Sequence, residues 1–124
     1  MKRELTLTHE PIAESAPQMS KDMGAVVTFH GVVRGTEEGK EITAIDYEAN
    51  EEMAQHQFDL IFNAIEERWP VGSIRLVHRL GVVPAKEAAL RMEIMAPHRA
   101  EAFEACQFLI NEMKTKVPIW KRPQ

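Results

Sequence analysis

The chain has 124 residues, 44% of them hydrophobic and 27% charged, which is the composition of an ordinary globular protein. We expect a single domain over residues 1–124. The formal net charge of −4 gives no general attraction for nucleic acid. No stretch approaches the roughly 20 consecutive apolar residues that a membrane span needs. Cys106 is the one cysteine, so an internal disulfide is excluded and a reducing, cytoplasmic location is expected.

Charge is unevenly distributed along the chain. Residues 110–124 hold four basic residues and one acid, a net of +3, so the other 109 residues carry −7. A basic cluster on an acidic protein is typical of a local anion site, and a solvated tail is the alternative.

The first half of the chain predicts strands separated by polar segments. Alternating apolar and polar residues predict a strand over 5–9, and the polar residues 12–22 could hold a short helix. The β-branched and aromatic run 24–33 predicts a buried strand, in which Gly31 indicates a bulge or a close backbone approach. A polar loop with two glycines follows over 34–40.

The second half of the chain predicts two amphipathic helices. Asn50 is a good N-cap, and apolar residues recur at helical spacing from there to the residue before Pro70. A second helix over 98–113 has an apolar stripe that includes Phe103 and Cys106. Further strands are expected over 42–48, 73–78 and 87–95.

The closing segment 117–120 is expected to be extended. Pro118 lacks a backbone donor and biases the residue before it away from helix. The order of strands and helices indicates an α+β fold.

Most familiar catalytic patterns are absent from the sequence. No HExxH or CxxC spacing indicates a metal site, and no GxSxG, P-loop or Rossmann glycine pattern is present. Cys106 lies on the apolar stripe of a predicted helix, where an inert core thiol is the expected role.

Basic residues at the ends of predicted elements remain as candidates. Arg34 closes the buried strand, and His98 and Arg99 open the second helix, where free backbone N–H groups favour an anion such as phosphate. Lys114 lies in the last turn, where the alternative is simple complementation of the helix dipole. Lys121 follows Trp120 in the apolar closing segment, and partial desolvation there would suit a lysine to proton transfer.

Several motifs, in order and across nearly the whole chain, resemble the catalytic (large) subunit family of molybdopterin synthase. The resemblance implies an α+β fold with a mixed, mainly antiparallel sheet packed with two main helices in one compact domain. The motifs are Gly31-Val32-Val33-Arg34, Ile45-Asp46-Tyr47-Glu48-Ala49 with Met53-Ala54, His78-Arg79-Leu80-Gly81, Pro97-His98-Arg99 with Glu101-Ala102-Phe103-Glu104-Ala105, and Lys114 followed by Val117-Pro118-Ile119-Trp120-Lys121.

The resemblance also implies a sulfurtransferase of molybdenum cofactor biosynthesis. In that family a homodimer binds two copies of a small ubiquitin-like sulfur carrier, which makes a heterotetramer. The C-terminal Gly-Gly thiocarboxylate of the carrier enters a pocket and gives sulfur to cyclic pyranopterin monophosphate, and two transfers form the dithiolene of molybdopterin. No cofactor and no protein-bound metal is implied, because the sulfur arrives already activated.

The resemblance assigns roles to particular residues. Lys114 and Lys121 would be catalytic, and Phe29 would pack against the pocket. The implied substrate-binding residues are Val32, Val33, Arg34, His98, Arg99, Lys114, Lys121, Arg122 and Pro123.

Two alternatives to a sulfur-transferring enzyme follow from the sequence. The loop after Arg34 reads Gly35-Thr36-Glu37-Glu38, where the family often has amide and His residues. A non-catalytic relative that binds the carrier without turnover would fit this change. A nucleic-acid-binding domain is disfavoured by the net charge and by only two Trp and one Tyr for stacking.

Overall fold

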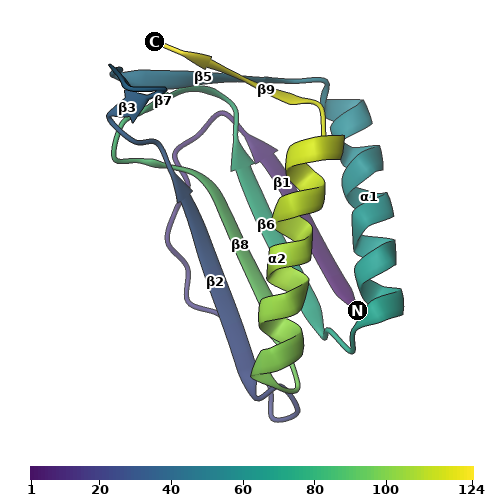
Figure 1. Ribbon diagram of the computed structural model, residues 1–124. Helices are drawn as coiled ribbons and strands as arrows, with labels where there is room; N and C mark the ends of the chain where they lie inside the picture. Colours follow the sequence, from purple (N-terminus) through teal and green to yellow (C-terminus); the bar gives the residue numbers. More distant parts are fainter.

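A four-stranded main sheet forms the centre of the computed structural model, which describes residues 1–124 (Figure 1). Its strand order is β1-β6-β8-β2, with β1 parallel to β6 and the other neighbours antiparallel. The strands are β1 (Lys2–Thr8), β2 (Ala25–Val32), β6 (Ser73–Arg79) and β8 (Ala88–Ala96).

Two helices, α1 (Glu51–Arg68) and α2 (Arg99–Lys116), lie side by side on one face of this sheet (Figure 1). The Asn50 side chain caps α1 as predicted, accepting a hydrogen bond of 3.2 Å from the backbone N–H of Met53. The main apolar core lies between helices and sheet, and its largest fully buried side chains are Phe58, Phe62, Ile65, Ile74, Leu76, Met92, Ile94 and Leu109. Neither helix combines the length and the apolar character needed to cross a membrane.

A second sheet of three strands lies across the end of the main sheet (Figure 1). Its order is β7-β5-β9, formed by Gly81–Pro84, Ala44–Ala49 and Ile119–Pro123. Its side chains Ile45, Tyr47 and Val83 form a smaller core together with Val33, Leu80 and Ala89 from the adjoining segments. The closing segment of the chain is therefore a strand of this sheet.

The bulge expected at Gly31 is present in β2. The pairing of β2 with β8 shifts register between Gly31 and Val32. A Cβ at Gly31 would also lie 3.2 Å from the Leu90 Cβ, so the close backbone approach is present as well.

The helix expected over 12–22 is wrong. Residues 11–20 have no regular secondary structure, and this connection crosses the face of the main sheet that the helices leave open. The Arg91 guanidinium donates a hydrogen bond of 2.8 Å to the Ser15 carbonyl there. The connection buries the polar face of β8, where Glu93 is 1% exposed and pairs with Arg75 at 3.3 Å.

The loop expected over 34–40 contains a short hairpin, β3 (Thr36–Glu37) paired with β4 (Lys40–Glu41). Glu38 and Gly39 have φ values of 51° and 77°, the left-handed conformation that a tight two-residue hairpin turn needs. The segment is therefore more ordered than its composition indicated.

Candidate functional site

The end of α2 and the strand that follows it carry the two candidate catalytic lysines. Lys114 is exposed in the last turn of α2, and the chain leaves the helix at Val117 to enter β9. There Lys121 lies directly opposite Tyr47 in the antiparallel pair β5·β9. Because directly opposed residues of neighbouring strands have their side chains on the same face, Lys121 lies on the same inward side of the sheet as buried Tyr47.

The basic cluster at the C-terminus divides into paired and unpaired residues. Lys116 pairs with Glu112 at 3.1 Å, and Arg122 pairs with Glu48 at 3.2 Å on the outward side of the second sheet. Lys114 and Lys121 form no ion pair and no side-chain hydrogen bond. Two cations are thus left free to bind an anion, while Arg122 is directed away from Lys121.

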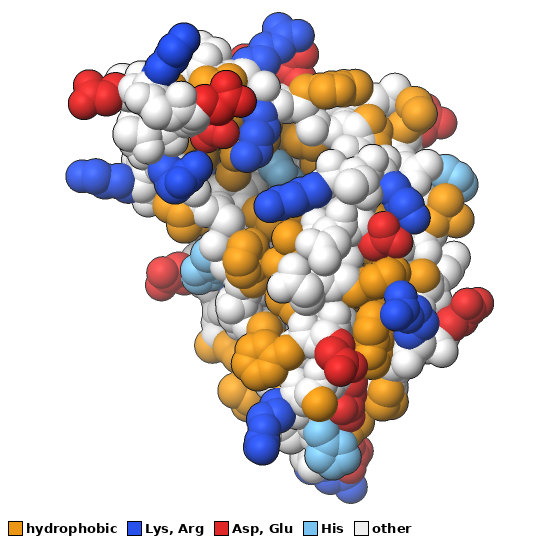
Figure 2. Space-filling model, viewed as in Figure 1, with side chains coloured by type: hydrophobic (Ala, Val, Ile, Leu, Met, Phe, Trp, Pro, Cys, Tyr) orange, Lys and Arg blue, Asp and Glu red, His pale blue; other side chains and the backbone are white.

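The residues at the end of β2 point in different directions. Val33 is 2% exposed and belongs to the smaller core, whereas Val32 is half exposed. Arg34 is exposed, without an ion pair, two residues after the end of β2. Pro123 lies opposite Ile45, on the inward side with Lys121. Figure 2 shows Lys and Arg side chains gathered beneath the second sheet and beside the end of α2.

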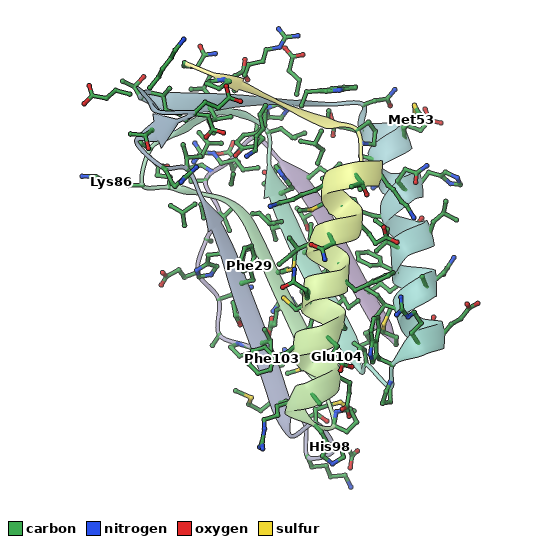
Figure 3. All side chains as sticks on the ribbon, in the orientation of Figure 1. Phe29, Met53, Lys86, His98, Phe103 and Glu104 are labelled. Carbon is green, nitrogen blue, oxygen red and sulfur yellow. The ribbon has the colours of Figure 1, made fainter.

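The structure does not bring His98 and Arg99 to these lysines within one chain. His98 lies at the opposite end of α2 (Figure 3). The 16 residues from His98 to Lys114 rise about 24 Å along the helix. The chain therefore holds two separate groups of candidate residues.

An acidic side chain, Glu101, lies at the N-terminus of α2 beside His98. His98 is the N-cap residue, and its Nδ1 lies 3.1 Å from Glu101 Oε1. The backbone N–H of Glu101 and the His98 side chain both lower the pKa of the Glu101 carboxyl. Glu101 stands at the third helical position, as in a capping box. Arg99 is exposed beside it without an ion pair.

His78 belongs to this region although the sequence assigned it no role in the site. It is 6% exposed, its Nδ1 lies 2.9 Å from the Arg79 carbonyl, and its ring packs edge-on against Tyr47 with centroids 5.3 Å apart. Burial lowers the pKa of the His78 ring below its usual 6.5, and the charge of Lys121 lowers it further. Burial and the charge of Glu37 raise the pKa of Tyr47. The sequence did carry a signal for this residue. His78 follows Ile74 and Leu76 at every second position of β6, so its side chain lies on the same inward side of the strand.

The buried His78 predicts a pH-dependent stability. At pH values between 6.5 and the lowered pKa of His78 in the folded protein, the His78 ring binds a proton in the unfolded chain but not in the native state. The free energy of unfolding is therefore expected to fall as the pH decreases below about 6.5. His78→Asn should flatten this profile in urea denaturation, and the exposed His56→Asn should leave it unchanged. An unaltered slope in the His78 variant would contradict the assignment.

Other features lie outside this region. Cys106 is buried beside Met92, and burial raises the pKa of its thiol, as expected for a core cysteine. No group of three or more His, Cys, Asp or Glu side chains is placed to hold a metal ion. Two hollows of about 810 and 280 Å³ lie under the β1–β2 connection, and neither is lined by the candidate lysines.

Comparison with known proteins gives consistent matches. A family model described as "MoaE protein" matches residues 5–116. A molybdopterin synthase catalytic subunit from Rattus norvegicus is 42% identical over 99 residues, which is 80% of this chain and 50% of the relative. The chain thus spans about half the length of the rat and human relatives that it matches.

Solved structures share the fold. The structure of molybdopterin synthase from Staphylococcus aureus is similar with a TM-score of 0.83 and 32% identity, covering 98% of this chain and 89% of that one. A protein-protein complex of subunits 1 and 2 of molybdopterin-converting factor from Helicobacter pylori has a chain with a TM-score of 0.73 and 19% identity, covering 98% and 83%; this likeness concerns the fold alone. The predicted α+β fold, with a mixed, mainly antiparallel sheet and two helices, is confirmed.

Proposed function

Because the chain belongs to the MoaE family, we propose that it is the catalytic subunit of a molybdopterin synthase. The proposed reaction moves sulfur from the C-terminal thiocarboxylate of a small ubiquitin-like carrier to cyclic pyranopterin monophosphate. Two such transfers form the dithiolene of molybdopterin. The protein would act as a sulfurtransferase without a redox cofactor or a protein-bound metal of its own.

The observation that carries this proposal is the pair of unpaired lysines where α2 leads into β9. Lys114 and Lys121 have no acidic partner, whereas Lys116 and Arg122 in the same segment do. The carrier's thiocarboxylate and the phosphate of the pterin are both anions and would be held by such cations. Once the thiocarboxylate sulfur is bonded to the pterin, water would add to the carrier's acyl carbon, and the C–S bond would then break to leave sulfur on the pterin and a carboxylate on the carrier. Negative charge develops on the acyl oxygen as water adds, and a lysine ammonium beside it would stabilise that charge or supply a proton.

A homodimer would complete the site. The residues Arg99, Phe103, Gln107, Ile110 and Lys114 fall on one stripe of α2, within about 80° of each other at 100° per residue. The stripe is exposed apart from the half-buried Ile110. If two copies pack this stripe antiparallel about a two-fold axis near its middle, Arg99 of one protomer meets Lys114 of the other. Two cations brought together in this way need an anion between them, which the pterin phosphate supplies.

Exposed apolar side chains support this contact. Phe103 on α2 is 61% exposed and Phe29 on β2 is 36% exposed, and both lie on the side of the molecule seen in Figure 3. β2 is also an edge strand of the main sheet. A second copy of the chain covering this surface would bury both rings.

A charge at the centre of this surface is expected to separate the protomers. Phe103→Asp should weaken the dimer by at least about 100-fold, since it removes an aromatic contact and buries a carboxylate. Sedimentation velocity over a range of concentrations would measure the change. The control is Leu60→Asp on α1, which is also about half exposed but lies off the stripe. A Phe103 variant that remains dimeric like the control would place the interface elsewhere.

The proposed partner is the carrier, with one copy for each Lys114–Lys121 pair and a heterotetramer as the complete assembly. The Helicobacter pylori protein of the same fold was solved as a complex of subunits 1 and 2. The carrier's extended C-terminal tail would approach between the second sheet and α2, where the unpaired cations lie.

One observation favours a second candidate, a relative that binds the carrier without turnover. Glu37 lies close enough to Tyr47 to raise the pKa of its hydroxyl, and Tyr47 stands opposite Lys121, so the β3–β4 hairpin adds a negative charge on the side of Lys121. This charge would oppose an anionic substrate.

A reconstitution experiment distinguishes the two. The purified protein is mixed with thiocarboxylated carrier and cyclic pyranopterin monophosphate, and the dithiolene product is sought by mass spectrometry. Product formation supports the synthase. Carrier binding without product supports the non-catalytic relative, and neither binding nor product contradicts both.

A further inference from the structure

His78 is the one buried histidine of the five in the chain. It stands near the end of β6, on the side of the main sheet that faces the helices, in register with Leu7 of β1 and Leu90 of β8. Its own neighbour Arg79 pairs with Glu87 at 2.8 Å. The ring makes one hydrogen bond within the fold, from Nδ1 to the Arg79 carbonyl, and this bond leaves its second nitrogen without an assigned role.

The hydrogen bond of the ring determines its tautomer. The partner of Nδ1 is a carbonyl oxygen, which only accepts, so Nδ1 carries the hydrogen and donates it. In the neutral ring Nε2 is then an acceptor. Nε2 has no hydrogen-bond partner. The fully buried side-chain nitrogen and oxygen atoms that lack a partner are Arg79 Nε and Glu93 Oε1, and Nε2 is not one of them. The Nε2 acceptor is therefore not fully buried, and a donor can reach it.

Tyr47 and Lys121 are the polar groups on this side. Tyr47 packs edge-on against the His78 ring and stands opposite Lys121 in the neighbouring strand. Of the charged side chains, Lys121 is the one whose charge acts on the ring. The Lys121 amine is a donor without a partner, and His78 Nε2 is an acceptor without one.

We propose that His78 is a positioning residue for Lys121, whose amine it orients through Nε2 toward the carrier's thiocarboxylate. The inference rests on the proposed function for its catalytic consequence. Lys121 extends from an edge strand, and a flexible lysine loses rotamer freedom when it is held. A fixed neutral acceptor restricts that freedom without neutralising the charge.

Two amide variants separate this role from a structural one. His78→Asn keeps a donor at the Nδ1 position and removes the acceptor at Nε2, whereas His78→Gln places an amide oxygen near the Nε2 position and loses the donor to Arg79. We expect the single-turnover rate of sulfur transfer to fall about tenfold in the Asn variant and to stay within about threefold in the Gln variant. The dissociation constant of the carrier should be unchanged in both. A purely structural role through the Arg79 carbonyl predicts the reverse order, and that result would overturn the proposal.

A second measurement does not depend on activity. The His78 ring is titrated by NMR in the full-length protein and in Lys121→Met, with Lys116→Met as the control. Removing the Lys121 charge should raise the pKa of His78, and the control should not. If His78 titrates identically in all three proteins, the Lys121 ammonium does not lie close to the ring and the proposal fails. If the pKa of His78 rises in Lys121→Met while neither the variants nor the wild-type protein form product, the proximity of the two groups stands and the proposed function fails instead.

Discussion

Replacing Lys121 or Lys114 with Ala is expected to lower the single-turnover rate of sulfur transfer by about 100-fold to 10,000-fold. Each lysine offers a free ammonium group at the junction of α2 and β9, and general acid-base or charge-stabilising groups contribute about this much to a rate. Neither lysine is buried or ion-paired. The fold should therefore survive both substitutions, and the loss should appear in the rate at saturating carrier. Product is measured by mass spectrometry after rapid mixing.

Lys116→Ala is the matched control. Lys116 lies one helical position beyond Thr115 at the same end of α2, but its charge is already paired with Glu112. Its rate should stay within about twofold of wild type, since a surface pair of this kind contributes little. Full activity in both the Lys114 and Lys121 variants would remove these residues from the mechanism.

Local patterns predicted most of the secondary structure. Alternation identified β1, β5 and β8, and the helical spacing of apolar residues identified α1 and α2. The Asn50 cap and the Gly31 bulge depend on neighbouring residues, so they too were visible in the sequence. These features follow from short-range geometry, which a sequence records directly.

Features that depend on distant segments were not predicted. The connection over residues 11–20 has no regular secondary structure and lies against the main sheet, where the Ser15 carbonyl accepts a hydrogen bond from Arg91. Arg91 and Glu93 are buried because this connection covers them, and the local sequence around β8 gives no sign of it. The short strand β7 was missed since its pairing partner, β5, lies far away in the sequence. Phe103 was placed on the core stripe of α2, but it is exposed because the helix turns only its other apolar residues inward.

The sequence named the candidate residues but not their arrangement, and their roles stay a prediction. The sequence identified Lys114 and Lys121, and the structure places both where α2 joins the second sheet. The sequence did not show that Arg122 points outward to Glu48, because the face on which a side chain of an edge strand lies is known only once the neighbouring strand is known. It also grouped His98 and Arg99 with the lysines, although a helix of 18 residues separates them. A set of motifs carries no distances between residues that lie far apart in the sequence.

Mixing two inactive variants provides the sharpest test of a site shared between protomers. Arg99→Ala and Lys121→Ala should each be inactive as homodimers, since every site lacks one residue. In a mixed dimer, one site would combine Lys121 of the first protomer with Arg99 of the second, and the other site would lack both.

Random exchange of subunits gives roughly one half mixed dimers, each with one intact site, so about one quarter of the wild-type activity should return. Subunit exchange is confirmed by native mass spectrometry before the assay. The control mixes Lys114→Ala with Lys121→Ala. In the proposed dimer each site takes both of its lysines from the same protomer. Every site in this mixed dimer therefore lacks one lysine, and activity should stay low. Restoration in the control, or none in the test pair, would show that Arg99 does not act across a two-fold axis. Restoration in the test pair alone would mean that the 24 Å between the two ends of α2 is closed by the partner rather than by any movement of the helix.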